Sequence, residues 1–225
     1  MAAKYNLMSQ LVFKFPFKTK YYEQDYYVST NNFSAYKLIE SWPTWPDRFL
    51  NIYGPSGCGK THLSNILKKK IELATIKEAK EINDKTITDL EKIDCLIIDN
   101  FEQNINEKLL YSLLNQLKQL NKFVLINTLI PIKNMKFELK DLKSRFDVFV
   151  SLGIDLPTDD LLRVIITKSF SDKQIEISPK ISEYIIKNVE RSYEKIFQFI
   201  KEIDDLSLSS GKSININLIK KVLKK

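Results

Sequence analysis

The chain has 225 residues, of which 44% are hydrophobic and 28% are charged. This composition is that of a globular protein with a substantial core, and it excludes a collagen-like or disordered chain. No apolar run reaches the roughly 20 residues that a membrane-spanning helix needs. The N-terminus lacks the basic and apolar regions of a secretory signal, so we expect a cytoplasmic protein without membrane contact.

The formal net charge of +7 would suit a nucleic-acid partner, but the lysines are spread along the whole chain. A solvated lysine surface explains them better than a dedicated DNA face does. Two cysteines, Cys58 and Cys95, are too few for a disulfide framework, and we expect both to be reduced.

The chain begins with an arm over residues 1–20. It contains a glutamine followed by spaced large apolar residues, at Gln10, Leu11, Phe13 and Phe15, while Pro16 disfavours a central strand. This pattern is typical of linear peptides that dock in a hydrophobic pocket. From these residues alone, an arm packed on its own domain is the simpler explanation.

A helix is predicted over residues 31–39, and a loop with Trp42 and Trp45 between prolines ends it. We expect the two tryptophans to cap the core. A strand follows over residues 49–53.

Directly after that strand, residues 54–61 fit the P-loop pattern G-x-x-x-x-G-K-[ST] at every fixed position. These residues are Gly54, Pro55, Ser56, Gly57, Cys58, Gly59, Lys60 and Thr61. The glycines let backbone N–H groups turn toward phosphate oxygens. Lys60 places a positive charge near the β- and γ-phosphates, and the Thr61 hydroxyl can bind Mg²⁺. A predicted helix follows, so the strand, loop and helix of a nucleotide-phosphate site occur in the required order.

Residues 73–76 predict a second strand and residues 83–91 a short helix. The apolar run 95–98 then ends in Asp99, which is typical of a buried parallel strand that delivers a Walker B carboxylate to Mg²⁺. Cys58 and Cys95 would flank this nucleotide site. Asn100 follows, where many ATPases carry a second carboxylate. Because an amide cannot take a proton from water, we expect slow intrinsic hydrolysis unless Glu102 or another group substitutes.

Residues 107–121 predict an amphipathic helix with leucines on one face, and residues 123–128 predict a buried strand. In P-loop ATPases, a polar side chain on this strand senses the γ-phosphate. Asn127 is the first candidate for that sensor and Thr128 the second, although either can equally be an ordinary strand-end residue.

A short helix is predicted over residues 139–146 and a strand over 148–152. Arg145, at the end of that helix, is placed to reach the nucleotide of a neighbouring subunit as an arginine finger. The alternative is a surface arginine paired with Asp141 or Asp147.

From Thr158 onward only helices are predicted, over residues 160–170, 178–189, 193–206 and 217–223. The predicted organisation is therefore an arm (1–20), an α/β nucleotide-binding domain (21–155) and a small helical lid domain (156–225).

Together these motifs resemble the AAA+ ATPases, whose P-loop core has a parallel sheet flanked by helices and carries a helical lid. Residues 54–63 and the sequence Leu-Lys-Ser-Arg-Phe at 142–146 resemble the ATPase domain of the replication initiator DnaA. The arm, Asn100 after Asp99, and the pattern of residues 216–223 are similar to the Hda family, the regulatory inactivators of DnaA. The initiator's helix-turn-helix DNA-binding domain is expected to be absent.

The resemblance implies a protein that binds ADP or ATP, resting with ADP, and that holds Mg²⁺ through Thr61 and Asp99. His62, Tyr27 and Val28 join the P-loop among the expected nucleotide-binding residues. Its implied partners are a DnaA-type initiator ATPase domain and the β sliding clamp of DNA polymerase III.

The resemblance also implies that the arm residues dock on the clamp. The protein would then contact DNA mostly indirectly, through the clamp, and lie near the nucleoid. Arg145 promotes hydrolysis of the ATP that the initiator holds and so prevents re-initiation. A homodimer or higher oligomer is compatible with this scheme.

Two departures from the family pattern concern the nucleotide. Leu129-Ile130-Pro131 replaces an Asp-Arg-Pro sequence after the sensor strand. The lid arginine that faces the nucleotide is replaced by Glu194-Lys195, with Arg191 a turn earlier. Either cation, or neither, can serve in its place, and Lys195 is the first candidate. The alternatives are a helicase or transposition loader of the DnaC type, which Asn100 disfavours, and a truncated initiator paralogue at the origin.

Overall fold

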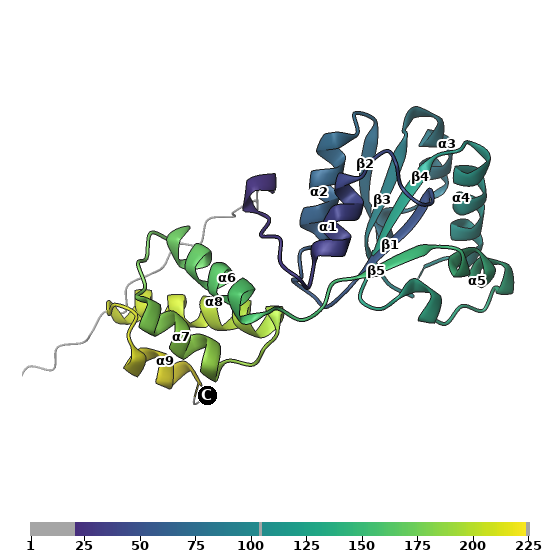
Figure 1. The fold of residues 1–225 in the computed structure, drawn as a ribbon. Helices are drawn as coiled ribbons and strands as arrows, with labels where there is room; N and C mark the ends of the chain where they lie inside the picture. The colour runs from purple at the N-terminus through teal and green to yellow at the C-terminus, as the bar shows by residue number, and fades with distance from the viewer. Residues whose placement is uncertain (1–20, 104, 224–225) are drawn as a thin grey trace, which may run out of the picture. The chain divides into compact units, whose positions relative to one another are not determined.

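The computed structural model describes residues 21–103 and 105–223. This part of the chain divides into two compact units, Tyr21–Leu156 and the residues from Pro157 onward. The first unit is a parallel sheet between two layers of helices, and the second contains helices alone (Figure 1). The arm residues Gln10, Leu11, Phe13 and Phe15 lie outside the described residues.

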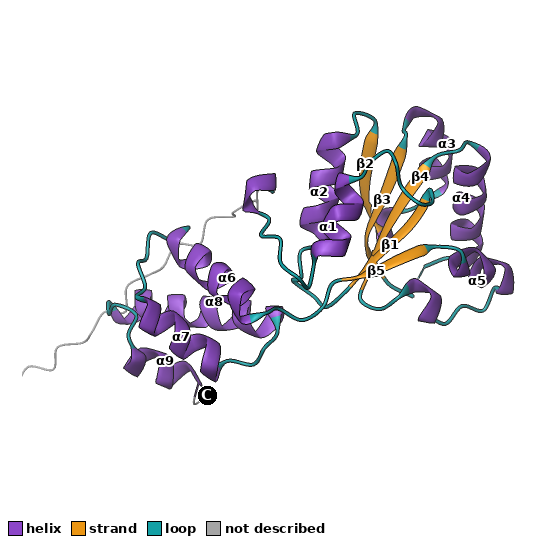
Figure 2. Ribbon diagram, in the orientation of Figure 1, coloured by secondary structure: helices purple, strands orange, loops and turns teal. Residues whose placement is uncertain are grey.

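Strands and helices alternate along the first unit, and Figure 2 shows the strands between the helices. The strands are β1 (Phe49–Tyr53), β2 (Ala74–Glu78), β3 (Cys95–Phe101), β4 (Phe123–Thr128) and β5 (Val150–Gly153). The α-helices are α1 (Phe33–Glu40), α2 (Lys60–Lys70), α3 (Asp84–Thr88), α4 (Glu107–Gln119) and α5 (Lys140–Asp147). Short 3₁₀ helices cover Glu23–Asp25, Ala79–Glu81, Asp89–Lys92 and Ile132–Asn134.

The strands are all parallel and lie in the order β2-β3-β4-β1-β5. The inner strands β3 and β4 are almost continuous buried apolar runs, as expected for a sheet with helices on both faces. One face of the sheet packs on the leucines of α4 (Leu110, Leu113, Leu114 and Leu117). Because the strands are parallel, the P-loop after β1, Asp99 on β3 and Asn127 on β4 come to the same edge.

Several expected boundaries differ from the structure: α1 begins at Phe33, β2 continues to Glu78, and α8 continues to Ser210. Two further differences have a visible cause. The strand predicted to begin at Val148 begins at Val150, because Val148 is the C-cap residue of α5 and is 64% exposed. The single helix predicted over 83–91 is divided, since α3 ends at Thr88 and a 3₁₀ helix continues from Asp89. The two tryptophans pack edge-on against each other and against Phe123, which confirms their predicted place at the rim of the core.

Asn51 is a fully buried polar residue in the middle of β1. Its amide nitrogen donates to the Ile126 carbonyl and to Thr128 Oγ1, both at 2.9 Å, and its oxygen accepts from the Ile132 amide at 3.0 Å. Asn51 therefore joins β1 to β4 and to the turn that follows β4.

Replacing Asn51 by alanine is expected to destabilise the first unit by about 1–3 kcal/mol, because three buried polar groups lose their partner. Urea denaturation followed by tryptophan fluorescence measures this loss, since both tryptophans of the chain lie in the first unit. The exposed Asn134 is the matched control, and Asn134→Ala is expected to leave the midpoint unchanged. Equal midpoints for the two variants would contradict a structural role for Asn51.

The second unit is a bundle of four helices, α6 (Asp159–Ser171), α7 (Pro179–Asn188), α8 (Tyr193–Ser210) and α9 (Ile216–Leu223). Serine or threonine side chains cap three of them, and the predicted start of α7 at Ser178-Pro179 is confirmed. The core of this unit includes Leu162, Phe170, Ile196 and Ile219. Among all described residues, no helix combines the length and the hydrophobicity needed to cross a membrane.

Candidate nucleotide-binding site

The P-loop has the backbone geometry that its glycines predict. Gly59 has φ 102° and begins α2, and a Cβ atom there would lie 2.9 Å from the Tyr26 ring. A Cβ atom on Gly54 would lie 2.6 Å from the Ile154 carbonyl oxygen. A side chain at either position would therefore force the loop apart, so the close turn requires glycine.

Lys60 is buried inside this loop. Its ammonium group donates to the Gly54 carbonyl at 2.6 Å and to the Pro55 carbonyl at 3.0 Å. Burial raises the pKa of the neighbouring Cys58 thiol, although Lys60 opposes the shift. Cys58 is therefore a neutral packing residue at physiological pH, and the charge of the loop comes from Lys60.

A hydrogen-bonded network joins α2, β3 and β4 beside the loop. Asp99 accepts from the Thr61 hydroxyl at 2.7 Å and from the Asn127 amide at 2.9 Å. The same amide donates to the Ser64 hydroxyl at 2.7 Å, and the buried Asn127 Oδ1 has no hydrogen-bond partner among the described residues. The Asn127 amide nitrogen is therefore held between Asp99 and Ser64. Thr128 is engaged by Asn51 and by the Ile130 carbonyl, so it acts in the structure of the strand end.

Thr61 and Asp99 fit the Mg²⁺ site that the P-loop motif predicts. Within residues 21–103 and 105–223, no group of three or more His, Cys, Asp or Glu residues could hold a metal ion. Mg²⁺ commonly takes one or two protein oxygens and completes its octahedron with phosphates and water. A metal ion here would therefore bind together with a nucleotide, not as a protein-held cofactor.

Asn100 adopts a left-handed backbone conformation, with φ 51°, which asparagine tolerates. Its amide donates to both carboxylate oxygens of Glu78 at 3.2 Å, and Glu78 lies opposite Asp99 on the adjacent strand β2. The Asn100 side chain is therefore held by the Glu78 carboxylate, while its backbone amide donates to Asp99 at 3.1 Å. Sequence reasoning missed Glu78, because the second strand was predicted to end at residue 76, whereas β2 continues to Glu78.

The segment before α1 lies along the P-loop. The Tyr26 ring packs against Gly59 and against His62, whose Nε2 is 2.7 Å from the Tyr22 carbonyl oxygen. His62 thus contacts this aromatic segment, and its contact with a nucleotide stays a prediction.

Two asparagines hold the loop that contains Tyr27 and Val28. Asn32 donates to the Tyr27 carbonyl at 3.0 Å, and Asn31 donates to the Asp155 carbonyl at 3.2 Å. In addition, the Asn31 backbone carbonyl accepts a hydrogen bond from the Asp155 amide at 3.1 Å. These contacts place the loop beside Asp155, two residues after the end of β5. Sequence reasoning did not identify Tyr26, Asn31 or Asn32.

Arg145 lies at the other edge of the sheet. It belongs to α5, which precedes β5, whereas the P-loop follows β1, and these two strands run parallel in register. The two edges are separated by about 13 Å along a strand, at about 3.3 Å per residue. In the described part of the chain Arg145 forms no ion pair, so the alternative pairing with Asp141 or Asp147 is not seen. Arg145 therefore lies at the sheet edge away from the P-loop of its own chain.

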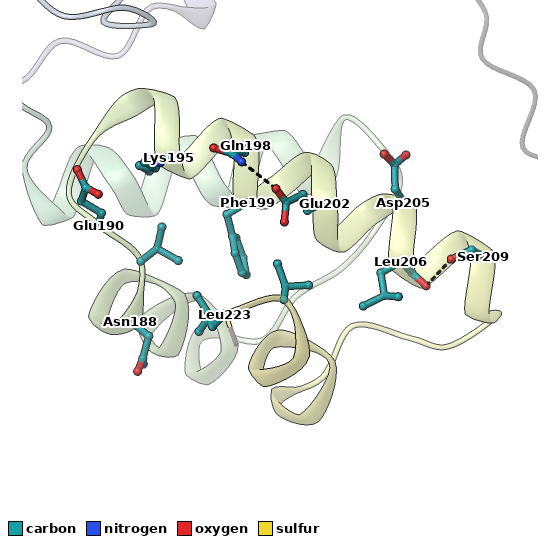
Figure 3. Close-up of a pocket in the computed structure, with 12 residues that line it drawn as sticks. Asn188, Glu190, Lys195, Gln198, Phe199, Glu202, Asp205, Leu206, Ser209 and Leu223 are labelled. Atoms are coloured by element: carbon teal, nitrogen blue, oxygen red, sulfur yellow. Dashed lines mark hydrogen bonds between the residues drawn. The ribbon is translucent and has the colours of Figure 1, made fainter. Parts of the chain in front are cut away.

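The two cations proposed for the lid lie on or before α8. Arg191 pairs with Asp159 at 2.6 Å, while Lys195 lines a groove of about 990 Å³ beside Glu190 and Phe199 (Figure 3). A nucleotide contact of Lys195 stays a prediction. The expectation that both cysteines flank the nucleotide site is wrong for Cys95. It begins β3, at the edge away from Asp99, and burial raises the pKa of its thiol to about 12.

Comparison with known proteins gives two family-model matches. Residues 50–141 match an RNA helicase model, and residues 159–223 match the lid domain of Hda. Among curated proteins, the initiator DnaA of Buchnera aphidicola subsp. Baizongia pistaciae is 26% identical over 96% of this chain. The alignment spans 53% of that relative, so the chain matches about half of its length.

Solved structures agree on the fold. Domain III of Thermotoga maritima DnaA matches with a TM-score of 0.75 at 19% identity, over 93% of this chain and 98% of that one. AMPPCP-bound DnaA from Aquifex aeolicus matches with a TM-score of 0.67 at 19% identity, over 83% of this chain and 65% of that one.

The parallel five-stranded sheet, the P-loop with Asp99, and the helical bundle define an AAA+ fold with a C-terminal lid. The RNA helicase match covers the P-loop and the Walker B strand, which P-loop proteins share. Within the AAA+ class the chain is DnaA-like, and its second unit matches the Hda lid.

Proposed function

We propose that this protein is an adenine-nucleotide-binding regulator of replication initiation of the Hda type. In this proposal it docks on the DNA-loaded sliding clamp through Gln10, Leu11, Phe13 and Phe15. It then promotes hydrolysis of the ATP that a DnaA-type partner holds. The observation that carries the proposal is the position of Arg145, which has no ion pair in the described chain and lies at the sheet edge opposite to its own P-loop.

Adenine nucleotide is the ligand that the site supports best. The loop built around Gly54 and Gly59, with the Lys60 ammonium inside it, fits the phosphates. A DnaA structure with the same fold is AMPPCP-bound. Thr61 and Asp99 would hold Mg²⁺, which supplies charge neutralisation of the phosphates when bound. We assign the remaining contacts to Tyr27, Val28 and Lys195.

The chemistry that we propose for Arg145 takes place on the partner's nucleotide. A planar guanidinium can donate two parallel hydrogen bonds to phosphate oxygens, so it stabilises the negative charge that develops on the transferred phosphoryl group. The partner provides its own P-loop and positions the attacking water. This chain contributes the arginine and, through its arm, the link to the clamp.

The test is hydrolysis of labelled ATP bound to the cognate DnaA-type protein, in the presence of clamp-loaded DNA. We expect the wild-type protein to accelerate hydrolysis when the clamp is present, and the double variant Gln10→Ala/Leu11→Ala to lose this acceleration. Absence of acceleration by the folded, nucleotide-bound wild type would refute the proposal. The helicase-loader alternative would then be preferred.

Intrinsic hydrolysis of the protein's own ATP is expected to be slow, because Asn100 cannot take a proton from water and its amide is bound to Glu78. Asn100→Glu should raise single-turnover hydrolysis by about 10²-fold, the low end of what a general base contributes. Asn100→Gln keeps an amide and is the control. If Asn100→Glu shows no gain while its nucleotide affinity is normal, the missing base is not what limits the rate.

A further inference from the structure

A cavity of about 640 Å³ opens in the first unit at the amino ends of β1, β4 and β5. The rings of Trp45, Phe49, Phe123 and Phe149 contribute to its walls. Arg145 belongs to the same lining, so the cavity lies beside the proposed arginine finger and at the edge away from the P-loop. The proposed function assigns no role to this cavity.

The rim of the cavity is positively charged. Arg48 stacks over the Phe123 ring, 4.4 Å from its centre, and donates to the Asn121 carbonyl at 2.9 Å. Lys118, at the end of α4, is exposed. Across residues 21–103 and 105–223, no carboxylate forms an ion pair with Arg48, Lys118 or Arg145. The one acidic residue of the lining is Asp47, whose carboxylate accepts from the Phe49 amide at 3.0 Å.

The mouth of the cavity also exposes apolar surface. Val148 lines it with 64% of its surface accessible, because the residue lies between the end of α5 and the start of β5. A surface with an apolar hollow and three unpaired cations is complementary to an apolar side chain that is flanked by carboxylates.

We propose that this cavity receives an aromatic or leucine-sized side chain from an acidic segment of the protein whose nucleotide Arg145 reaches. The inference rests on the proposed function, because Arg145 and the cavity share one lining. A partner that brings its phosphates to Arg145 must also cover the cavity. In this arrangement Arg48 and Lys118 give affinity and orientation, while Arg145 acts on the nucleotide.

The test measures binding and catalysis separately with the full-length chain. Binding to the ATPase domain of the cognate DnaA-type protein, loaded with a non-hydrolysable ATP analogue, is measured by fluorescence anisotropy at two salt concentrations. Lys118→Glu is expected to weaken binding at least tenfold, and Val148→Ser about threefold. Lys143→Glu is the matched control, since Lys143 is also an exposed helical lysine but does not line the cavity, and it should bind within twofold of wild type.

At saturating concentration, Lys118→Glu should still stimulate hydrolysis at nearly the wild-type maximal rate. Equal affinities for Lys118→Glu and Lys143→Glu, with stimulation by the wild type intact, would overturn the cavity inference and leave the proposed function standing. Binding that is weakened by Lys118→Glu, without any stimulation by the wild type, would refute the proposed function alone. If Lys118→Glu weakens the binding of a single-stranded oligonucleotide but not of the ATPase domain, the cavity rim binds nucleic acid and the inference is wrong.

Discussion

Replacing Arg145 by alanine is expected to reduce the stimulated hydrolysis of DnaA-bound ATP by about 10³-fold or more, the range that arginine fingers contribute. The protein should remain folded and should keep its affinity for its own nucleotide. Arg145 forms no ion pair within the described residues, and it lies at the sheet edge away from the P-loop. The measurement is single-turnover hydrolysis by the partner at saturating concentrations of each variant, with clamp-loaded DNA present.

Two further variants separate the role of the guanidinium from that of a positive charge. Arg145→Lys keeps the charge but loses the planar pair of donors, so it should recover only a small part of the rate. Lys143→Ala removes a cation from the same helix and should have no effect. A full rate with Arg145→Ala would show that the stimulating group lies elsewhere in the chain.

Removing the charge of Lys60 should produce the second large effect, on the protein's own nucleotide. Lys60→Met keeps the unbranched stem but loses the charge-assisted hydrogen bond to phosphate, which contributes about 1.5–3 kcal/mol. The affinity for ATP and ADP should therefore fall roughly 10- to 150-fold. Titration with a fluorescent adenine nucleotide measures the change directly.

The control for Lys60 is Lys68→Met, on the same helix but exposed in its last turn. Because Lys60 also donates to the Gly54 and Pro55 carbonyls, the variant's melting temperature must be measured without nucleotide. Weak binding with an unchanged melting temperature supports a direct contact with phosphate. Unchanged binding in a folded Lys60→Met would mean that the loop does not hold nucleotide phosphates.

The fold class and much of the phosphate site could be predicted because their signals are local. Gly54 to Thr61 are consecutive residues, and each fixed position supplies a backbone turn, a charge or a hydroxyl that binding of nucleotide phosphates requires. Asp99 and Asn127 each follow an uninterrupted apolar run. In a parallel sheet such runs end at one edge, so the meeting of both side chains near Thr61 follows from the strand pattern.

Other features came from contacts that no local pattern reports. The pairing of Asn100 with Glu78 depends on the register of β2 against β3. The support of Tyr27 by Asn32, and the position of Tyr26 over Gly59, depend on how the segment before α1 folds back on the loop. The apolar character of Val148 predicts a strand residue, but Val148 follows the end of α5 and is exposed.

By itself, the sequence determined the order of strands and helices, the phosphate loop, the candidate metal-binding pair Thr61 and Asp99, and Arg145 as a residue of interest. It could do so because each of these is carried by neighbouring residues or by the end of one element. Only the tertiary structure decided that Asn127 rather than Thr128 contacts Asp99, and that a cationic aromatic cavity lies beside Arg145. The cavity brings together Arg48, Lys118 and Arg145 from separate elements, and Asn127 meets Asp99 across two strands. Such proximity exists only once the strands have paired.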